Sequence, residues 1–302
     1  MAHLRGLLAR LDRGDLLFLV AVGGAYVAAT AFATTGHHLV PDRMMVLAER
    51  LFQGHLDDPS FAGTVDSVFV GGRYYIAVGP LQVIPYIPFV PFEVLHGVAR
   101  YVVALIPGLV AAWLALPLAR AYGASGSTAY WVAGFTAFGT LLFFVSVTGN
   151  MYYLAHAESF LALTCFMLEW AGRRRPLALG LALALSFLAR PTTILAGLPF
   201  GIALLWGRRD WLRRALLLGA PVAGAVLAFG WFNFVRFGSP LESGYGISTL
   251  LSGILQTRRD AGIFSLRHVP ENLRLALVSF FDLRPGFPFI VPNRFGLSML
   301  LV

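Results

Sequence analysis

The chain has 302 residues, of which 58% are hydrophobic and 13% are charged, and its mean hydropathy is +0.73. Soluble domains carry about 25% charged residues, so this composition excludes an ordinary soluble domain. The net charge is +8 and every basic residue except histidine is arginine, but the arginines stand in short clusters between apolar runs. That distribution is typical of loops that set membrane topology, and it argues against nucleic-acid binding. The single cysteine, Cys165, excludes an intrachain disulfide.

Apolar runs near the ~20 residues that a membrane-crossing helix needs recur along the chain, which predicts an all-α polytopic membrane protein. Leucines at helical spacing indicate that residues 1–14 form a cytoplasmic helix at the membrane surface. Residues 15–36 form the first span and residues 99–236 the rest of a bundle of about seven transmembrane helices. Residues 296–302 resemble the start of a further span, so we expect a longer parent protein. The other expected spans are 101–118, 129–147, 153–170, 177–188, 193–206 and 216–234.

The arginine clusters predict the orientation of these spans. With the N-terminus in the cytoplasm, the clusters at residues 173–175 and 208–214 both fall on the cytoplasmic side. This holds only if the proline-rich segment 80–96 does not cross the membrane, so we expect it to be re-entrant or peripheral. Residues 37–98 then form an extracytoplasmic loop with juxtamembrane helices, and residues 237–295 form a second extracytoplasmic segment.

The first extracytoplasmic loop holds the candidate catalytic residue. Asp42 precedes an amphipathic helix, where it either caps the helix N-terminus or presents a carboxylate at the mouth of a cavity, and one residue can do both. Further along, residues 68–76 predict a β-hairpin with a two-glycine turn that places Phe69 opposite Tyr74. The hairpin is either purely structural or part of a sugar or phosphate site, and its candidate substrate-binding residues are Asp66, Arg73, Tyr74 and Tyr75.

Polar residues also gather at predicted outer ends of the spans. Tyr152 and His156 share one helical face, whereas Glu158 points away from it. Arg190 and Arg236 break the positive-inside pattern. An ionisable residue at membrane depth is costly, so these five are candidate substrate-binding residues; the alternative is a side chain that extends to the outer interface. Arginine suits the role because its guanidinium clasps phosphate oxygens in a fork.

The sequence lacks the motifs of nucleotide-binding loops, serine hydrolases and zinc proteases. Adjacent acids such as Asp57 and Asp58 do not have metal-ligand spacing. We therefore predict no tightly bound metal and no cofactor.

Four stretches, in this order, resemble the GT-C superfamily of bacterial membrane glycosyltransferases, in the group of protein O-mannosyltransferases and aminoarabinose transferases (family 39-like). They are Asp42 with MMVLAERLFQGHLDDP, then GGRYYIAVGPLQVIPYIPF, LSFLARPTTILAGLP and WFNFVRFGSPLESGYG. The resemblance implies a GT-C-like bundle in the bacterial inner membrane. It also implies transfer of a sugar from a polyprenyl-phosphate or polyprenyl-diphosphate donor to a glycan, lipid or protein acceptor on the extracytoplasmic face, among membrane lipids.

The resemblance also implies that Asp42 is the general base of a direct displacement. The chain departs from the family in two ways. Arg43 follows Asp42 where the family often has an acid or glycine. The chain also has no lysine, so Arg73, Arg190 or Arg236 would contact the lipid phosphate. Two other classes of function stay open. A transporter or flippase of lipid-linked sugars would need polar groups at mid-membrane and often repeated halves. A non-catalytic subunit of an envelope-assembly complex would not need Asp42. Among enzymes, the nearest alternative is a polymerase or ligase of surface glycans.

Overall fold

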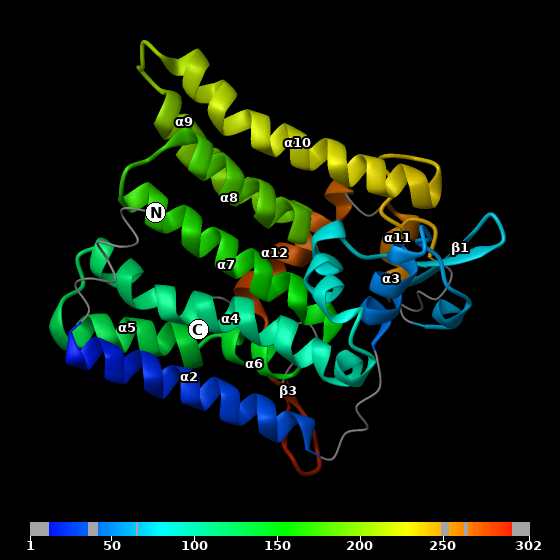
Figure 1. The fold of residues 1–302 in the computed structure, drawn as a ribbon, viewed down its shortest axis with the longest axis horizontal. Coiled ribbons are helices and arrows are strands. Elements are labelled where there is room, and N and C mark those ends of the chain that lie inside the picture. Colours follow the sequence, from blue (N-terminus) through cyan, green and yellow to red (C-terminus); the bar gives the residue numbers. More distant parts are fainter. Residues whose placement is uncertain (1–11, 36–41, 65, 249–253, 263–264, 292–302) are drawn as a thin grey trace.

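The computed structural model describes residues 12–35, 42–64, 66–248, 254–262 and 265–291. These residues are mostly helical, and the strands among them form two small antiparallel pairs (Figure 1). Residues 1–11 of the surface helix expected at 1–14, and the further span expected at 296–302, lie outside the described residues. Residues 13 and 14 belong to α2 (Arg13–Thr34), so this helix begins two residues before the expected first span.

Four described helices are long and apolar enough to cross a membrane. They are α2 (Arg13–Thr34), α4 (His96–Ala121), α7 (Met151–Ala171) and α10 (Trp211–Phe237). The prediction of a helical membrane protein is thereby supported. The predicted count of about seven spans is not confirmed, because two of the expected segments are shorter helices and a third is bent.

The bent segment consists of α5 (Gly126–Phe138) and α6 (Leu141–Val147), which meet at 49° and would make a fifth span if counted as one. The break has a local cause. Gly139 ends α5, and the hydroxyl of Thr140 then caps α6 by accepting from the backbone N–H of Leu142 at 3.2 Å. The two shorter apolar helices are α8 (Pro176–Ala189) and α9 (Leu198–Leu205), joined by the 3-10 helix η5 (Pro191–Gly197).

The helices pack as a layered bundle. Helix α10 packs on α8, α8 on α7 and α7 on α4, while α2, α5 and α6 cover the other side of α4 (Figure 1). Small residues permit this close packing. Gly180 of α8 lies against the backbone of Leu218 in α10, and a Cβ at Gly180 would overlap the Leu218 carbonyl oxygen.

The two ends of the bundle differ. We call the end that faces α3 and the strands β1 and β2 the hairpin end, and the opposite end, with the turns at residues 172–175 and 206–210, the arginine end (Figure 1). The hairpin-end elements before α4 are α3 (Arg43–Phe52), η1 (Pro59–Phe61), β1 (Ser67–Val70), β2 (Arg73–Ile76), η2 (Pro80–Gln82), η3 (Ile84–Phe89) and η4 (Glu93–Leu95).

Strands β1 and β2 pair with Phe69 opposite Tyr74, which confirms the predicted hairpin register. The proline-rich segment forms the three short helices η2, η3 and η4. The elements after α10 are α11 (Ile254–Asp260), η6 (Leu266–His268), α12 (Val269–Val278), β3 (Asp282–Leu283) and β4 (Ile290–Val291).

An ion pair joins three helices at the arginine end. The carboxylate of Asp15 in α2 is 1% exposed and accepts from both terminal nitrogens of Arg120 in α4, at 2.8 and 2.5 Å. The hydroxyl of Tyr130 in α5 donates to the same carboxylate at 2.7 Å. A buried carboxylate needs such partners, so these contacts fix how α2, α4 and α5 align.

We predict that Arg120→Ala destabilises the protein more than Asp15→Asn does. Losing Arg120 leaves a buried carboxylate without its cation and costs about 2 kcal/mol, below the 3–5 kcal/mol of a fully buried pair, because the Arg120 side chain is 36% exposed. Losing the Asp15 charge costs less, because Arg120 reaches water. Thermal unfolding in detergent micelles measures both, and the double variant should recover part of the loss. Equal losses would contradict this account.

Candidate functional site

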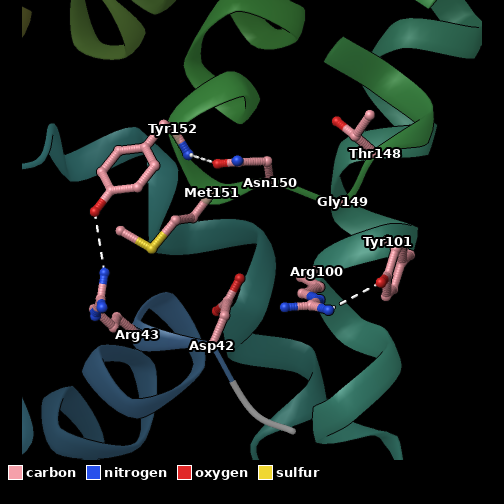
Figure 2. Close-up of a pocket in the computed structure, with 9 residues that line it drawn as sticks. All are labelled: Asp42, Arg43, Arg100, Tyr101, Thr148, Gly149, Asn150, Met151 and Tyr152. Carbon is pink, nitrogen blue, oxygen red and sulfur yellow. Dashed lines mark hydrogen bonds between the residues drawn. The ribbon is translucent and has the colours of Figure 1, made fainter. Parts of the chain in front are cut away.

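A cavity of about 360 Å³ opens at the hairpin end. It lies where the N-terminus of α3, the first turns of α4 and the turn between α6 and α7 meet (Figure 2). Most of the residues that line it have polar side chains. They are Asp42, Arg43, Arg100, Tyr101, Thr148, Gly149, Asn150, Met151 and Tyr152.

Asp42 is held by three donors. One carboxylate oxygen accepts from the backbone N–H groups of Met44 and Met45, both at 3.0 Å, and so caps α3. The other oxygen accepts from the Tyr86 hydroxyl of η3 at 2.8 Å. Burial raises the pKa of Asp42, although these hydrogen bonds and the charge of Arg100 lower it in part. Asp42 therefore combines the two roles that the sequence left open, a helix cap and a carboxylate that lines a cavity.

Two arginines flank this carboxylate, as Figure 2 shows. Arg43 donates to the Tyr152 hydroxyl at 3.0 Å, and Arg100 donates to the Tyr101 hydroxyl at 2.9 Å. The Nε of Arg100 is buried and has no hydrogen-bond partner among the described residues, and the same is true of the Thr148 hydroxyl. An unpaired buried donor costs about 1–3 kcal/mol, so this wall of the cavity is suited to a ligand that accepts hydrogen bonds.

The upper wall in Figure 2 is the turn between α6 and α7. Asn150 caps α7 by accepting from the backbone N–H of Tyr152 at 2.9 Å. Gly149 precedes it with φ +59 and packs on the Tyr101 ring, where a Cβ would overlap the ring carbons. A larger residue at Gly149 would therefore push the turn off α4 and widen the cavity.

A second polar group adjoins the cavity on the Tyr152 side. Burial raises the pKa of Asp66, and the nearby charge of Arg43 lowers it in part. Burial, together with the charge of Asp66, raises the pKa of Tyr245 to about 12. Arg190 is hydrogen-bonded to the His156 ring, with 3.0 Å to its Nδ1. The structure thus brings residues predicted from four separate parts of the chain to the hairpin end of the bundle. They are Asp42, Asp66, Tyr152 with His156, and Arg190.

The hairpin residues lie away from the cavity, as in the structural alternative that the sequence left open. The exposed Arg73 forms an ion pair with Asp57 at 3.5 Å. The Tyr74 ring packs on Phe69, with 4.7 Å between ring centroids, and the buried Tyr75 ring packs on Phe237 at 5.8 Å. Arg73, Tyr74 and Tyr75 do not line the cavity, and neither does Asp66, the fourth candidate of the hairpin.

Arg236 also lies outside the cavity. Its side chain is 2% exposed, and its guanidinium donates to the carbonyl oxygens of Ile76 and Val78 at 2.8 and 3.2 Å. It donates further to Asn233 Oδ1 at 3.0 Å and to the Phe232 carbonyl at 3.2 Å. All three of its nitrogens are engaged, so the observed role of Arg236 is to tie the hairpin to α10.

Glu158 belongs to α7 and does not line the cavity. Its residue is 8% exposed, and neither carboxyl oxygen has a hydrogen-bond partner among the described residues. Burial raises the pKa of the Tyr86 hydroxyl well above its usual range, and the charges of Asp42 and Glu158 raise it further. Glu158 is therefore close enough to affect the tyrosine that holds Asp42.

The chain matches no protein-family model, no curated protein and no solved structure. Within the described residues, no group of three or more histidine, cysteine, aspartate or glutamate side chains could hold a metal ion, and the predicted lack of a metal stays a prediction.

Sequence reasoning missed Arg100 and Tyr101. The sequence does distinguish Arg100, because it is an arginine near the start of a span and lies at the end opposite to the arginine clusters at 173–175 and 208–214.

We predict that Arg236→Ala lowers the free energy of unfolding by about 3 kcal/mol, because two buried carbonyl groups lose a charged donor. Arg190→Ala is the matched control, since it removes a less buried guanidinium at the same end. It should cost less than about 1 kcal/mol. Thermal unfolding in detergent micelles compares the two. An Arg236→Ala protein of unchanged stability would mean that the guanidinium does not hold the hairpin.

Proposed function

We propose that the chain is a membrane glycosyltransferase. It transfers a sugar from a polyprenyl-phosphate or polyprenyl-diphosphate donor to an acceptor hydroxyl at the extracytoplasmic face of a bacterial inner membrane. The observation that carries the proposal is the cavity that sets the Asp42 carboxylate beside the guanidinium groups of Arg43 and Arg100, at the end of apolar helices. The arginine-rich turns at the opposite end support the orientation, because such clusters favour the cytoplasm.

In this proposal, Asp42 takes the proton from the acceptor hydroxyl. The acceptor oxygen bonds to the anomeric carbon while the bond from that carbon to the phosphate oxygen breaks. One displacement of this kind inverts the anomeric centre. The leaving phosphate gains negative charge, which Arg100, with its unpaired Nε, and Arg43 stabilise. This assignment gives the phosphate contact to Arg43 and Arg100 in place of the expected Arg73, Arg190 or Arg236.

Tyr86 positions the base. Its hydroxyl donates to one oxygen of Asp42, and the α3 backbone donates to the other, so the carboxylate is oriented before substrate binds. The polyprenyl tail would lie along the apolar surface of the segment 80–96, where Ile84 is exposed.

A transporter of lipid-linked sugars is the second candidate function. The observation that favours it is the buried, unpaired Glu158 within the span α7, because intramembrane carboxyl groups often serve transport. The two candidates differ in product, since a transporter would move the donor without forming a new glycosidic bond.

We predict that Asp42→Asn lowers sugar transfer at least about 100-fold, because the amide cannot accept the proton. Asparagine caps a helix as well as aspartate does, so the fold should be kept. The matched control is Asp58→Asn, the same change at the N-cap of η1 and away from the cavity. Transfer is measured in membranes with radiolabelled polyprenyl-phosphate sugars. Unchanged transfer in Asp42→Asn would remove this residue from the chemistry.

No transfer by the unsubstituted protein with any such donor, together with movement of the donor across vesicle membranes, would favour the transporter instead.

The pH dependence of kcat/KM gives a further prediction. A base works only when deprotonated, so transfer should fall as the pH drops through the raised pKa of Asp42, at a higher pH than for an ordinary carboxylate. Tyr86→Phe removes a hydrogen bond that lowers this pKa, so the acidic limb should move to still higher pH. An acidic limb at the same pH in both proteins would mean that Asp42 is not the titrating base.

A further inference from the structure

A second cavity, of about 180 Å³, lies at the arginine end. Its lining residues come from the end of α7, the turn that joins α7 to α8, the helix α9, the turn that joins α9 to α10 and the first turn of α10. The two turns lie at the same end of the bundle (Figure 1). Two apolar residues of α9 form part of its wall. The remainder of the wall consists of Trp170 and four arginines, Arg173, Arg174, Arg208 and Arg214.

The positive charge around this cavity is not balanced by nearby carboxylates. Residues 169–175 and 208–214 together hold seven arginines and two acids, which gives an excess of five positive charges. Both acids are engaged. Glu169 pairs with Arg175 at 2.6 Å, and Asp210 pairs with Arg214 at 2.9 Å. The other three arginines that line the cavity form no ion pair among the described residues.

One of these three is held in place. The Nε of Arg174 donates to the Trp170 carbonyl oxygen at 2.9 Å, and its guanidinium carbon lies 4.8 Å from the centre of the Trp170 ring. The Arg174 backbone has φ +53, a left-handed conformation that disfavours residues other than glycine. A glycine would fit this turn with less strain, so the arginine side chain is present at a conformational cost.

Membrane topology alone does not account for this arrangement. The orientation of spans depends on the number of arginines near their ends, and it does not require that they surround a cavity. Guanidinium groups close to one another repel, and among the described residues only Arg214 of the four cavity arginines has a carboxylate partner, so an anion between the other three would relieve the repulsion.

We propose that this cavity binds the phosphate of an anionic phospholipid headgroup from the leaflet that covers the arginine end. Guanidinium groups donate paired hydrogen bonds to phosphate oxygens, and basic pockets between membrane helices recognise such headgroups. A lipid fits better than a soluble phosphate, because exposed apolar side chains flank the opening. Trp206 is 78% exposed and Trp211 is 54% exposed, as expected of tryptophans at a bilayer interface, and Ile202 offers apolar surface for an acyl chain.

This inference does not depend on the proposed glycosyl transfer, since the two cavities lie at opposite ends of the bundle. The bound headgroup bridges the two turns and thereby stabilises the packing of α9 and α10 beside α7.

The test compares two charge-matched double variants of the full chain in detergent micelles. Arg173→Gln with Arg208→Gln removes two cavity arginines, whereas Arg209→Gln with Arg213→Gln removes two that do not line the cavity. Native mass spectrometry measures binding of phosphatidylglycerol, phosphatidylcholine and inorganic phosphate. We expect the cavity variant to bind phosphatidylglycerol about 30-fold more weakly. Each arginine near anionic lipid contributes about 1 kcal/mol to binding, and every 1.4 kcal/mol changes the dissociation constant about tenfold. The control should lose less than about threefold.

Equal losses in the two double variants would overturn the proposal in favour of diffuse surface charge. Binding of phosphatidylcholine as tight as that of phosphatidylglycerol would overturn the preference for an anionic lipid, and equally tight inorganic phosphate would identify a soluble anion instead.

Arg174→Gly separates lipid binding from folding. Glycine relieves the left-handed backbone, so the unfolding temperature without lipid should stay the same or rise, while phosphatidylglycerol binding weakens. A variant that keeps full lipid affinity would show that Arg174 does not contact the headgroup and would contradict the proposed site.

Discussion

The carboxylate of Asp42 is the contact on which the hairpin end depends. It caps α3 with one oxygen and accepts from Tyr86 with the other, so the start of α3 and the helix η3 are held to the same group. The buried face of α3 then packs in a cluster with residues of β2, η3, α4 and α7, including Ile76, Val103 and Leu154. The position of the cavity is therefore set by a polar contact and an apolar core that support each other.

The two cavities contain similar cations in different surroundings. At the hairpin end, Arg43 and Arg100 share a cavity with a carboxylate, so the site can hold an anion and accept a proton at once. At the arginine end, the unpaired guanidinium groups lack a carboxylate in the cavity wall, and that site can hold an anion without moving a proton. In the two proposals, one carboxyl group separates a site that would accept a proton from a site that would only bind an anion.

The sequence predicted what local patterns determine. Apolar length located α2, α4, α7 and α10, the paired glycines located the hairpin turn, and the spacing after Asp42 located a helix cap. It did not predict contacts between distant segments. Arg236 was expected to meet substrate, but its carbonyl partners lie 160 and 158 residues away in the chain. Arg100 was missed because a single arginine near the start of a span has the same pattern whether it anchors a helix or lines a cavity.

The ion pair of Asp15 has a consequence for how the protein is made. Its cation lies 105 residues further along the chain, and Tyr130 follows 115 residues after it. During synthesis α2 therefore leaves the ribosome before Arg120 and Tyr130 have been made, and its Asp15 carboxylate then has only its local partner, the backbone N–H of Asp12. The native alignment of α2 with α4 and α5 can form only after all three helices have been synthesised, so α2 is made well before the contacts that fix its position.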